Sequence, residues 1–306
     1  MLDFPNMNEC DIDEWEAIVD EYILSAKEKN KKAAIIASLP ETLPEHIREK
    51  CLKSSIVPLQ GLKESLYAIH CSILVGQAWS KFNILKVIHL KNTQKNLKKT
   101  YSEYESKKIL KNYGIKIPQS ILSNAHNALI DSKKIGFPIV IKINSKKILH
   151  KTEVKGVFTN IDSETKLKKS LKHISKLGNQ FIIEKMIHDQ IAEMILGIKI
   201  DKQFGPVIII GTGGIYTELI KDSVTLLLPL KKSLILNAIN NLKISKFLYG
   251  YRGKPKGDIK SLIETILKLG KFAEKNASRL IEVDINPLIV RSRGKGVVAA
   301  DALIHY

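Results

Sequence analysis

Two apolar segments near the end of the chain place three polar side chains where a pair of β-strands brings them together. Residues 282–288 read EVDINPL, and residues 297–301 read VVAAD. Because side chains alternate along a strand, Asp284 and Asn286 point to one face, and a neighbouring strand delivers Asp301. One amide oxygen and two carboxylates form the oxygen-rich kind of site that Mg²⁺ prefers. The alternative is a β-hairpin with polar residues at its ends.

The charge of the chain does not by itself indicate a nucleic-acid protein. The 306 residues carry a formal net charge of +18, from 49 basic and 31 acidic side chains. Such an excess invites a nucleic-acid interpretation. Only five of the basic residues are arginines, however, and nucleic-acid recognition draws heavily on arginine. A solvated lysine-rich surface is the better interpretation, and we expect no nucleic-acid partner.

Hydropathy and cysteine content favour a globular cytoplasmic protein. No apolar run reaches the roughly 18 residues of a transmembrane helix, and the acidic start lacks the pattern of a signal peptide, so we expect no membrane partner. The cysteines, Cys10, Cys51 and Cys71, are odd in number and widely spaced. This spacing fits neither a disulfide framework nor a zinc site, and it agrees with a reducing compartment.

The first 80 residues alternate between helical and strand patterns. This order suggests an α/β fold with a parallel sheet, although two strands are too few for an independent one. Residues 81–100 contain six lysines and no acidic residue, which predicts a linker. The predicted helices of the first part are 11–29, 44–53 and 62–79, and the predicted strands are 33–37 and 57–59.

From residue 101 the pattern becomes α+β, with amphipathic helices between groups of strands. The predicted helices are 103–113, 164–177, 232–242 and 258–276. The predicted strands are 139–143, 154–161, 181–187, 191–200, 207–210, 215–221 and 225–228.

Several segments carry a family resemblance. In chain order they are 104–110 with 113–115, 137–142, 148–154, 204–206 with 211–214, 250–253 and 284–288. The region 101–306 resembles the ATP-grasp domain of the ADP-forming acyl-CoA synthetases of the acetyl-CoA type, relatives of the succinyl-CoA synthetase β subunit. Residues 38–41 and 58–62 resemble the end of the flavodoxin-like CoA-ligase domain that precedes ATP-grasp in single-chain members. The expected fold is therefore α/β: a two-lobed α+β ATP-grasp domain at 101–306, preceded by a partial flavodoxin-like segment at 1–80.

The resemblance implies a nucleotide site between the two lobes. Lys142 lies inside the apolar strand 139–143, where a lysine needs an anion or a solvent-facing side, and in the family it grips the nucleotide phosphates. Glu184 ends a strand that leads into the interlobe hinge, where Ile187 lies and where the backbone contacts the adenine. Glu193 matches the carboxylate that binds the ribose hydroxyls. The alternatives are an edge-strand lysine and solvent-facing glutamates.

Gly213 and Gly214 follow a buried strand and belong to the expected nucleotide site. Glycines let backbone N–H groups approach an anion closely. The segment is not a Walker loop, because no Lys-Ser or Lys-Thr pair follows it. The alternative is an ordinary turn.

The resemblance also implies a metal site and a phosphoryl carrier. Asn286 and Asp301 are expected to hold Mg²⁺. Asp284 stands where the succinyl-CoA enzyme has a glutamate that steadies a phosphohistidine. His150 lies in the polar loop 144–153 and matches a second phosphohistidine found in some ADP-forming acetyl-CoA synthetases. An imidazole is a competent nucleophile toward a phosphoryl group. The alternative is a solvated loop histidine.

The implied reaction is acyl-CoA + ADP + phosphate giving carboxylate + ATP + CoA, reversibly. We expect ATP or ADP and Mg²⁺ as cofactors, and a small carboxylate and CoA as substrates. The upstream CoA-binding half of the family is not present in this sequence, so a CoA-binding partner is expected. Two other functions remain open: an ATP-grasp carboxylate–amine ligase and a non-catalytic nucleotide-binding module.

Overall fold

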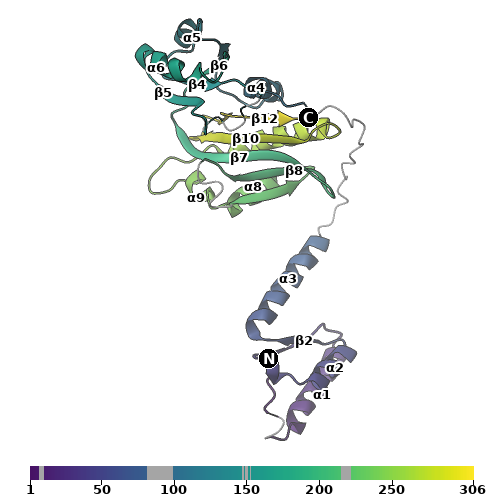
Figure 1. Cartoon of the computed structure of the whole chain (residues 1–306). Coiled ribbons are helices and arrows are strands. Elements are labelled where there is room, and N and C mark those ends of the chain that lie inside the picture. Colours follow the sequence, from purple (N-terminus) through teal and green to yellow (C-terminus); the bar gives the residue numbers. More distant parts are fainter. Residues whose placement is uncertain (7–9, 81–98, 147, 149–150, 152, 215–221) are drawn as a thin grey trace. The chain divides into compact units, whose positions relative to one another are not determined.

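The structure is a computed structural model that describes residues 1–6, 10–80, 99–146, 148, 151, 153–214 and 222–306. These residues form two compact units, one within Met1–Ile84 and the other within Leu85–Tyr306 (Figure 1). Nearly all of the predicted linker lies outside the described residues, as do His150 and the predicted strand at 215–221. Across the described ranges, every helix is too short or too polar to cross a membrane.

The N-terminal unit is a small α/β fold in which β1 and β2 pair in parallel. Its core is a cluster of buried apolar side chains, among them Val19, Ile35 and Ile47. Apolar periodicity predicted its helices and strands to within about two residues at each end. The elements of the unit are α1 (Asp13–Glu28), β1 (Ala34–Ala37), the 3₁₀ turn η1 (Pro40–Thr42), α2 (Glu45–Lys53), β2 (Val57–Gln60) and α3 (Leu62–Ser80).

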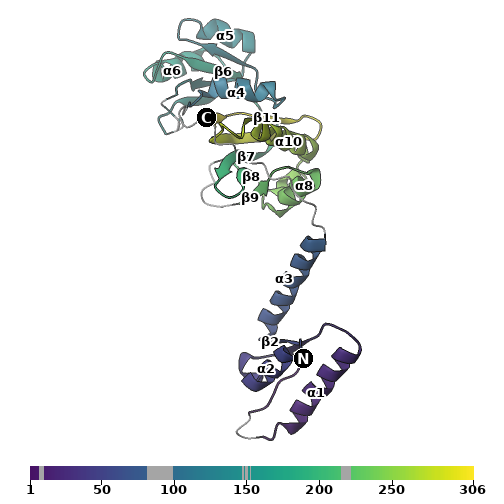
Figure 2. The same ribbon diagram turned by 90° about the vertical axis from the view of Figure 1, so that its right-hand side faces the viewer.

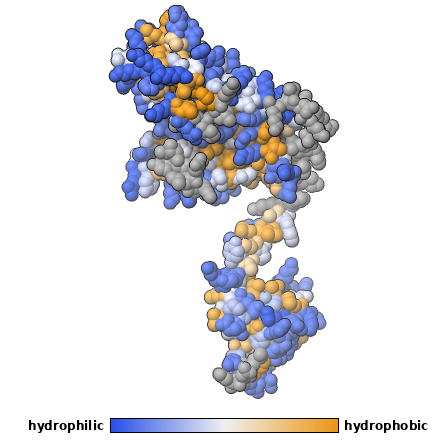
Figure 3. Space-filling model, viewed as in Figure 1, coloured by the Kyte–Doolittle hydropathy of each residue, from blue (hydrophilic) through white to orange (hydrophobic). Residues whose placement is uncertain are grey.

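Helix α3 is rich in apolar residues that this unit leaves uncovered. Ser65 is its one buried residue, whereas Tyr67 is 70% and Trp79 is 75% exposed. Figure 3 also shows hydrophobic residues, in orange, on the surface of the N-terminal unit. The exposed large apolar residues of α3 are Leu62, Leu66, Tyr67, Ile73, Leu74, Val75 and Trp79.

The C-terminal unit begins with a helix and an antiparallel sheet in the strand order β3-β6-β4-β5. Ile139, Ile141 and Phe181 form part of a core beneath α5 and α6. The short elements β3 and α5 were not predicted, because four or eight residues carry too little periodicity to identify them. The elements are α4 (Glu103–Asn112), β3 (Ser120–Ser123), α5 (Ala128–Ile135), β4 (Ile139–Ile143), β5 (Val157–Ile161), α6 (Glu164–Ile174) and β6 (Phe181–Lys185).

A second sheet follows, in the strand order β11-β10-β7-β8-β9, with β12 pairing to β10. Helices α8 and α10 lie against this sheet (Figure 2), and the α10 side chains Leu262, Ile266 and Phe272 are fully buried. The elements are β7 (Gln190–Asp201), β8 (Gly205–Thr212), β9 (Ser223–Leu227), α8 (Lys232–Asn241), α9 (Ser245–Leu248), α10 (Ile259–Asn276), β10 (Glu282–Arg291), β11 (Val297–Ala299) and β12 (Leu303–His305). The mixed helix and sheet class predicted from the sequence is confirmed.

Helix α4 connects to both sheets of the C-terminal unit. Ser102 caps the helix: the Ser102 hydroxyl accepts from the Glu105 N–H, and the Glu105 carboxylate accepts from the Ser102 N–H. The Ser106 hydroxyl accepts from the Ile304 N–H of β12 at 3.1 Å. Lys107, on the same helix, bonds to Glu184 of β6. The capping box and these contacts hold the first turns of α4 in place against β6 and β12.

Candidate active site

A cavity of about 250 Å³ lies between the two sheets of the C-terminal unit. It contains six residues of the predicted site: Lys142, Glu184, Ile187, Glu193, Asn286 and Asp301. Apolar side chains from β4, β5, the segment after β6 and β10 complete the wall: Val140, Val157, Met186, Ile187, Pro287 and Ile289. Residues more than 150 positions apart in the sequence therefore meet at one site.

Lys142 is a buried lysine in an interior strand. β4 lies between β6 and β5, so the edge-strand alternative is wrong. The side chain is 9% exposed. Its ammonium group donates to Glu103 Oε1 at 2.8 Å and to the Ala300 carbonyl oxygen at 2.7 Å, and it lies 3.3 Å from Glu184 Oε2. A buried lysine of this kind is retained only with such partners.

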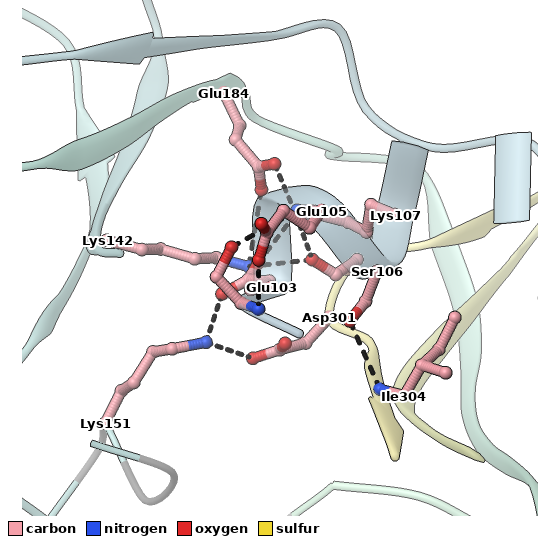
Figure 4. Close-up of polar contacts among 11 residues, drawn as sticks. Glu103, Glu105, Ser106, Lys107, Lys142, Lys151, Glu184, Asp301 and Ile304 are labelled. Carbon is pink, nitrogen blue, oxygen red and sulfur yellow. Dashed lines mark hydrogen bonds and ion pairs between the residues drawn. The ribbon is translucent and has the colours of Figure 1, made fainter. Parts of the chain in front are cut away.

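Glu103, the first residue of α4, accepts from lysines of three different segments (Figure 4). Its side chain is 1% exposed. Glu103 Oε1 accepts from Lys107 at 2.6 Å and from Lys142, and Glu103 Oε2 accepts from Lys151. The first turn of a helix also favours an acidic side chain. Glu103 thus joins α4 to β4 and to Lys151 in the segment before β5.

Lys107 and Glu184 complete the buried part of this network. Lys107 bonds to Glu184 Oε1 and donates to the Ala300 carbonyl at 3.1 Å. The Glu184 side chain is 2% exposed, so the solvent-facing alternative for Glu184 is wrong. Its carboxylate is directed at Lys107 and Lys142 (Figure 4).

Asp301 lies at the edge of the network, 3.6 Å from Lys151. We call the whole set the lysine–carboxylate cluster. It contains three lysines and three acidic residues, so its formal charge is zero. The members are Glu103, Lys107, Lys142, Lys151, Glu184 and Asp301.

The cluster keeps its central groups ionised. Burial raises the pKa of Glu103, but the ammonium groups of Lys142, Lys107 and Lys151 outweigh it and hold that pKa well below its usual range. Burial lowers the pKa of Lys142, but the carboxylates of Glu103, Glu184 and Asp301 outweigh it and raise that pKa above its usual value. Lys142 is therefore a fixed positive charge at the cavity wall near neutral pH.

Asn286 and Asp301 line the cavity together and fit a magnesium site. Burial and the Glu103 carboxylate raise the pKa of Asp301, against the opposing effect of the lysines. A divalent cation favours the ionised form of such a carboxylate. Among the described residues, no three His, Cys, Asp or Glu side chains form a metal-binding group. Mg²⁺ usually has one or two protein carboxylates plus nucleotide phosphates, so the pair is sufficient.

Asp284 is adjacent to this pair but does not line the cavity. It lies on β10 opposite Leu303 of β12, and the pairing of β10 with β7 shifts in register between Ile285 and Leu288. Burial raises the pKa of Asp284, and the carboxylates of Glu282 and Asp301 raise it further. Asp284 is therefore close enough to Asp301 to interact with the charge of its carboxylate.

Gly213 and Gly214 lie against β7 next to Glu193. The Gly213 N–H donates to the Glu193 carbonyl at 2.8 Å, and a Cβ at Gly213 would lie 2.7 Å from the Met194 backbone. Gly214 has a φ of +80°, and a Cβ there would lie 2.8 Å from Glu193 Oε2. Both positions therefore require glycine. Neither residue is part of the cavity wall, whereas Glu193 is.

The segment that connects β6 of one sheet to β7 of the other is held by an ion pair that sequence reasoning missed. The Asp189 carboxylate accepts from Arg291 Nε at 2.6 Å and Nη2 at 3.1 Å, and Lys295 lies 3.2 Å away. The Arg291 hydrogen bond in particular lowers the pKa of Asp189 to about 2. The pair ties the segment after Ile187 to the end of β10.

Sequence reasoning also did not assign Glu103 and Lys107 to the site. Lys107 belongs to the segment 104–110 that carries the family resemblance, and Glu103 directly precedes that segment. A Glu–Lys pair at positions i and i+4 of a helix is common on surfaces. Their near-complete burial could not be inferred from that spacing. Lys151 lies in the predicted loop 144–153, directly after His150, and was not among the predicted site residues; His150 itself lies outside the described residues.

The fold and the charged cavity agree with one known class of protein. Residues 92–305 match the ATP-grasp domain, so the chain belongs to the ATP-grasp family. The chain is 33% identical over 211 residues to the β subunit of acetate–CoA ligase (ADP-forming) II of Pyrococcus furiosus, which covers 66% of this chain and 89% of that subunit. Its resemblance to the ADP-forming acyl-CoA synthetases is thereby confirmed.

Longer proteins and solved structures give the same family. The chain is 30% identical over 305 residues to 4-hydroxybutyrate–CoA ligase (ADP-forming) of Nitrosopumilus maritimus, covering 93% of this chain and 43% of that ligase. A structure of Ca. Korarchaeum cryptofilum dinucleotide forming acetyl-coenzyme A synthetase 1 with coenzyme A and Mg-AMPPCP matches with a TM-score of 0.59 and 30% identity, over 66% of this chain and 92% of that chain. In that structure the phosphohistidine segment points towards the nucleotide binding site.

Proposed function

We propose that the cavity between the two sheets binds ADP or ATP together with Mg²⁺. The observation that carries the proposal is the position of Lys142, a buried ammonium group in the wall of a cavity that also holds Asn286 and Asp301. The apolar wall suits an adenine ring, and Ile187 lies in the hinge segment expected to contact it. Glu193 is assigned to the ribose hydroxyls, and Gly213 and Gly214, which lie beside Glu193 outside the cavity wall, stay a prediction of the nucleotide site.

We further propose that the chain is the ATP-grasp part of an ADP-forming acyl-CoA synthetase. It transfers a phosphoryl group between ADP or ATP and a phosphohistidine, within the reaction acyl-CoA + ADP + phosphate = carboxylate + ATP + CoA. Lys142 positions the phosphates and neutralises charge as it shifts between oxygens. Asn286 and Asp301 would hold Mg²⁺, which would neutralise further phosphate charge when bound. Asp284, near the start of β10, would steady the phosphohistidine.

We assign His150 as a phosphoryl relay. Lys151, the next residue in the chain, belongs to the lysine–carboxylate cluster, and this supports the assignment. Incubation of the full chain with γ-labelled ATP and Mg²⁺ is expected to give an acid-labile, base-stable label. His150→Ala is expected to remove that label, whereas His126→Ala, a matched change outside the site, is expected to keep it. Equal labelling of all three proteins would contradict the assignment.

We propose that the chain works with a CoA-binding half. Support comes from the β-subunit name of the Pyrococcus furiosus relative and from the larger size of the Nitrosopumilus maritimus ligase. The apolar residues of α3 that its own unit leaves uncovered are candidates for that contact. CoA and a small carboxylate would bind mainly in the partner. A cytoplasmic location agrees with the free thiols of Cys10, Cys51 and Cys71.

A synthetase assay separates this proposal from the two alternatives. The purified chain is expected to show no CoA-dependent formation of ADP from ATP and acetate, and addition of a CoA-binding partner is expected to start it. Release of ADP that depends on an amine instead of CoA would favour a carboxylate–amine ligase. Nucleotide binding without turnover under either condition, with the partner present, would favour a non-catalytic module. The CoA-ligase names of the relatives favour the synthetase.

A further inference from the structure

The lysine–carboxylate cluster satisfies its buried lysines with groups of the protein itself. An ammonium group has three N–H donors. Lys142 is in contact with Glu103, Glu184 and the Ala300 carbonyl, and Lys107 is in contact with the same three residues. Two of the Lys142 contacts are hydrogen bonds, to Glu103 and to the Ala300 carbonyl, and the third is an ion pair with Glu184 at 3.3 Å. A phosphate oxygen that approaches Lys142 therefore competes with carboxylates that already neutralise its charge.

Glu103 is the acceptor that can be exchanged with least disturbance. Its Oε1 contacts Lys142, which lines the cavity, and its Oε2 contacts Lys151, which lies 3.6 Å from Asp301 of the cavity wall. Without Glu103, Lys142 still has Glu184 and the Ala300 carbonyl, and Lys151 still has Asp301 at 3.6 Å. Both ammonium groups would thus stay close to their present positions.

We propose that Glu103 stands in for the nucleotide phosphates: it neutralises Lys142, and Lys151 beside it, when no nucleotide is bound, and it competes with the phosphates for these two lysines. This inference rests on the nucleotide binding proposed above. The net charge of the cluster predicts that removing the Glu103 charge strengthens nucleotide binding. The cluster is neutral with Glu103 and carries +1 without the Glu103 charge. Both the loss of a competitor and the added positive charge strengthen binding of an anion.

The test is calorimetric titration of the full chain with ADP, with and without Mg²⁺. Glu103→Gln keeps the size of the side chain and removes its charge, and it is expected to bind ADP about tenfold more tightly than the wild type. Glu103→Asp retains the charge and is expected to bind within about threefold of the wild type. Glu164→Gln makes the same change of charge on the exposed face of α6, where Glu164 pairs with Lys133 at 2.8 Å, and is expected to leave affinity unchanged. A folded Glu103→Gln protein with equal or weaker affinity overturns the inference.

A measurement on the wild-type protein covers the case in which Glu103→Gln does not fold. In a crystal structure with ADP and Mg²⁺, Lys142 or Lys151 is expected to donate to a phosphate oxygen and to lie beyond hydrogen-bond distance, about 3.5 Å, from Glu103. Unchanged contacts from Glu103 to both lysines in the presence of bound ADP overturn this inference but leave the proposed function standing. Failure of the wild type to bind ADP overturns the proposed function, and this inference with it.

Discussion

The wall of the cavity has two regions that are held in place by different forces. The charged region consists of Lys142, Glu184 and Asp301, the members of the lysine–carboxylate cluster that line the cavity, and each depends on partners from other segments of the chain. The apolar region, which includes Val140, Val157, Ile187 and Ile289, is held by packing. Removing one partner of a buried ion pair leaves an uncompensated charge, whereas trimming an apolar side chain removes area in proportion to its size. The charged region should therefore respond to mutation sharply and the apolar region gradually.

The largest effect is expected for Lys142→Met. The change removes one of the two cations that Glu103 and Glu184 share, the other being Lys107, and it removes the proposed phosphate contact. We expect about 100-fold weaker ADP binding, and a loss of about 3 kcal/mol in the free energy of unfolding. Calorimetric titration and urea unfolding measure the two quantities. Lys166→Met, a change at an exposed i,i+4 pair with Asp162, is the matched control. Unchanged ADP affinity in Lys142→Met would contradict the proposed contact of Lys142 with the phosphates.

Asp301→Ala is expected to have the next largest effect. It should change how strongly ADP binding depends on Mg²⁺ more than it changes the ADP affinity measured without Mg²⁺. Without the Asp301 carboxylate, Asn286 is left as the assigned protein ligand, and ADP binding should lose most of its response to Mg²⁺. The quantity to measure is the ratio of ADP affinities with and without Mg²⁺. Asp201→Ala, in the turn between β7 and β8, serves as the control. A ratio equal to that of the wild type would place the metal elsewhere.

Ile187→Ala tests the apolar region. The side chain is half-buried and lines the cavity in the hinge segment. Loss of its outer carbons should weaken ADP binding by about 1 kcal/mol, roughly fivefold, because less apolar surface is buried against the base. The Mg²⁺ response should stay as in the wild type. A loss as large as that of Lys142→Met would show that the two regions do not differ in the way we describe.

Asp189→Asn is expected to have the smallest effect, on stability alone. The pKa of Asp189 is lowered to about 2, so its ion pair with Arg291 stabilises the fold above the ordinary carboxyl pKa of about 4. That contribution, about 1 kcal/mol, should be constant above roughly pH 5 and should disappear as the pH falls through about 2. The difference in unfolding free energy between wild type and Asp189→Asn, followed from pH 7 downward, measures it. A difference that grows on acidification would contradict the assignment.

The two regions also differ in how far the sequence could predict them. Lys142 stood out because a charged residue interrupts an apolar strand, and Asn286 and Asp301 stood out because they end apolar segments. Glu103 and Lys107 did not, since their spacing is equally typical of a solvated helix. Their burial depends on Glu184, 77 positions after Lys107, and on Ala300, 193 positions after it. Local periodicity carries no information about such distant contacts.

The central claim is that this chain binds a nucleotide through a charged cavity that also holds Mg²⁺. Thermal unfolding of the full chain, followed at increasing ADP concentration with and without Mg²⁺, tests it most directly. Because a ligand that binds the native state raises its apparent stability, we expect a melting temperature that rises with ADP and rises further with Mg²⁺. A folded sample whose melting temperature is unchanged at millimolar ADP, with Mg²⁺ present, would contradict the claim.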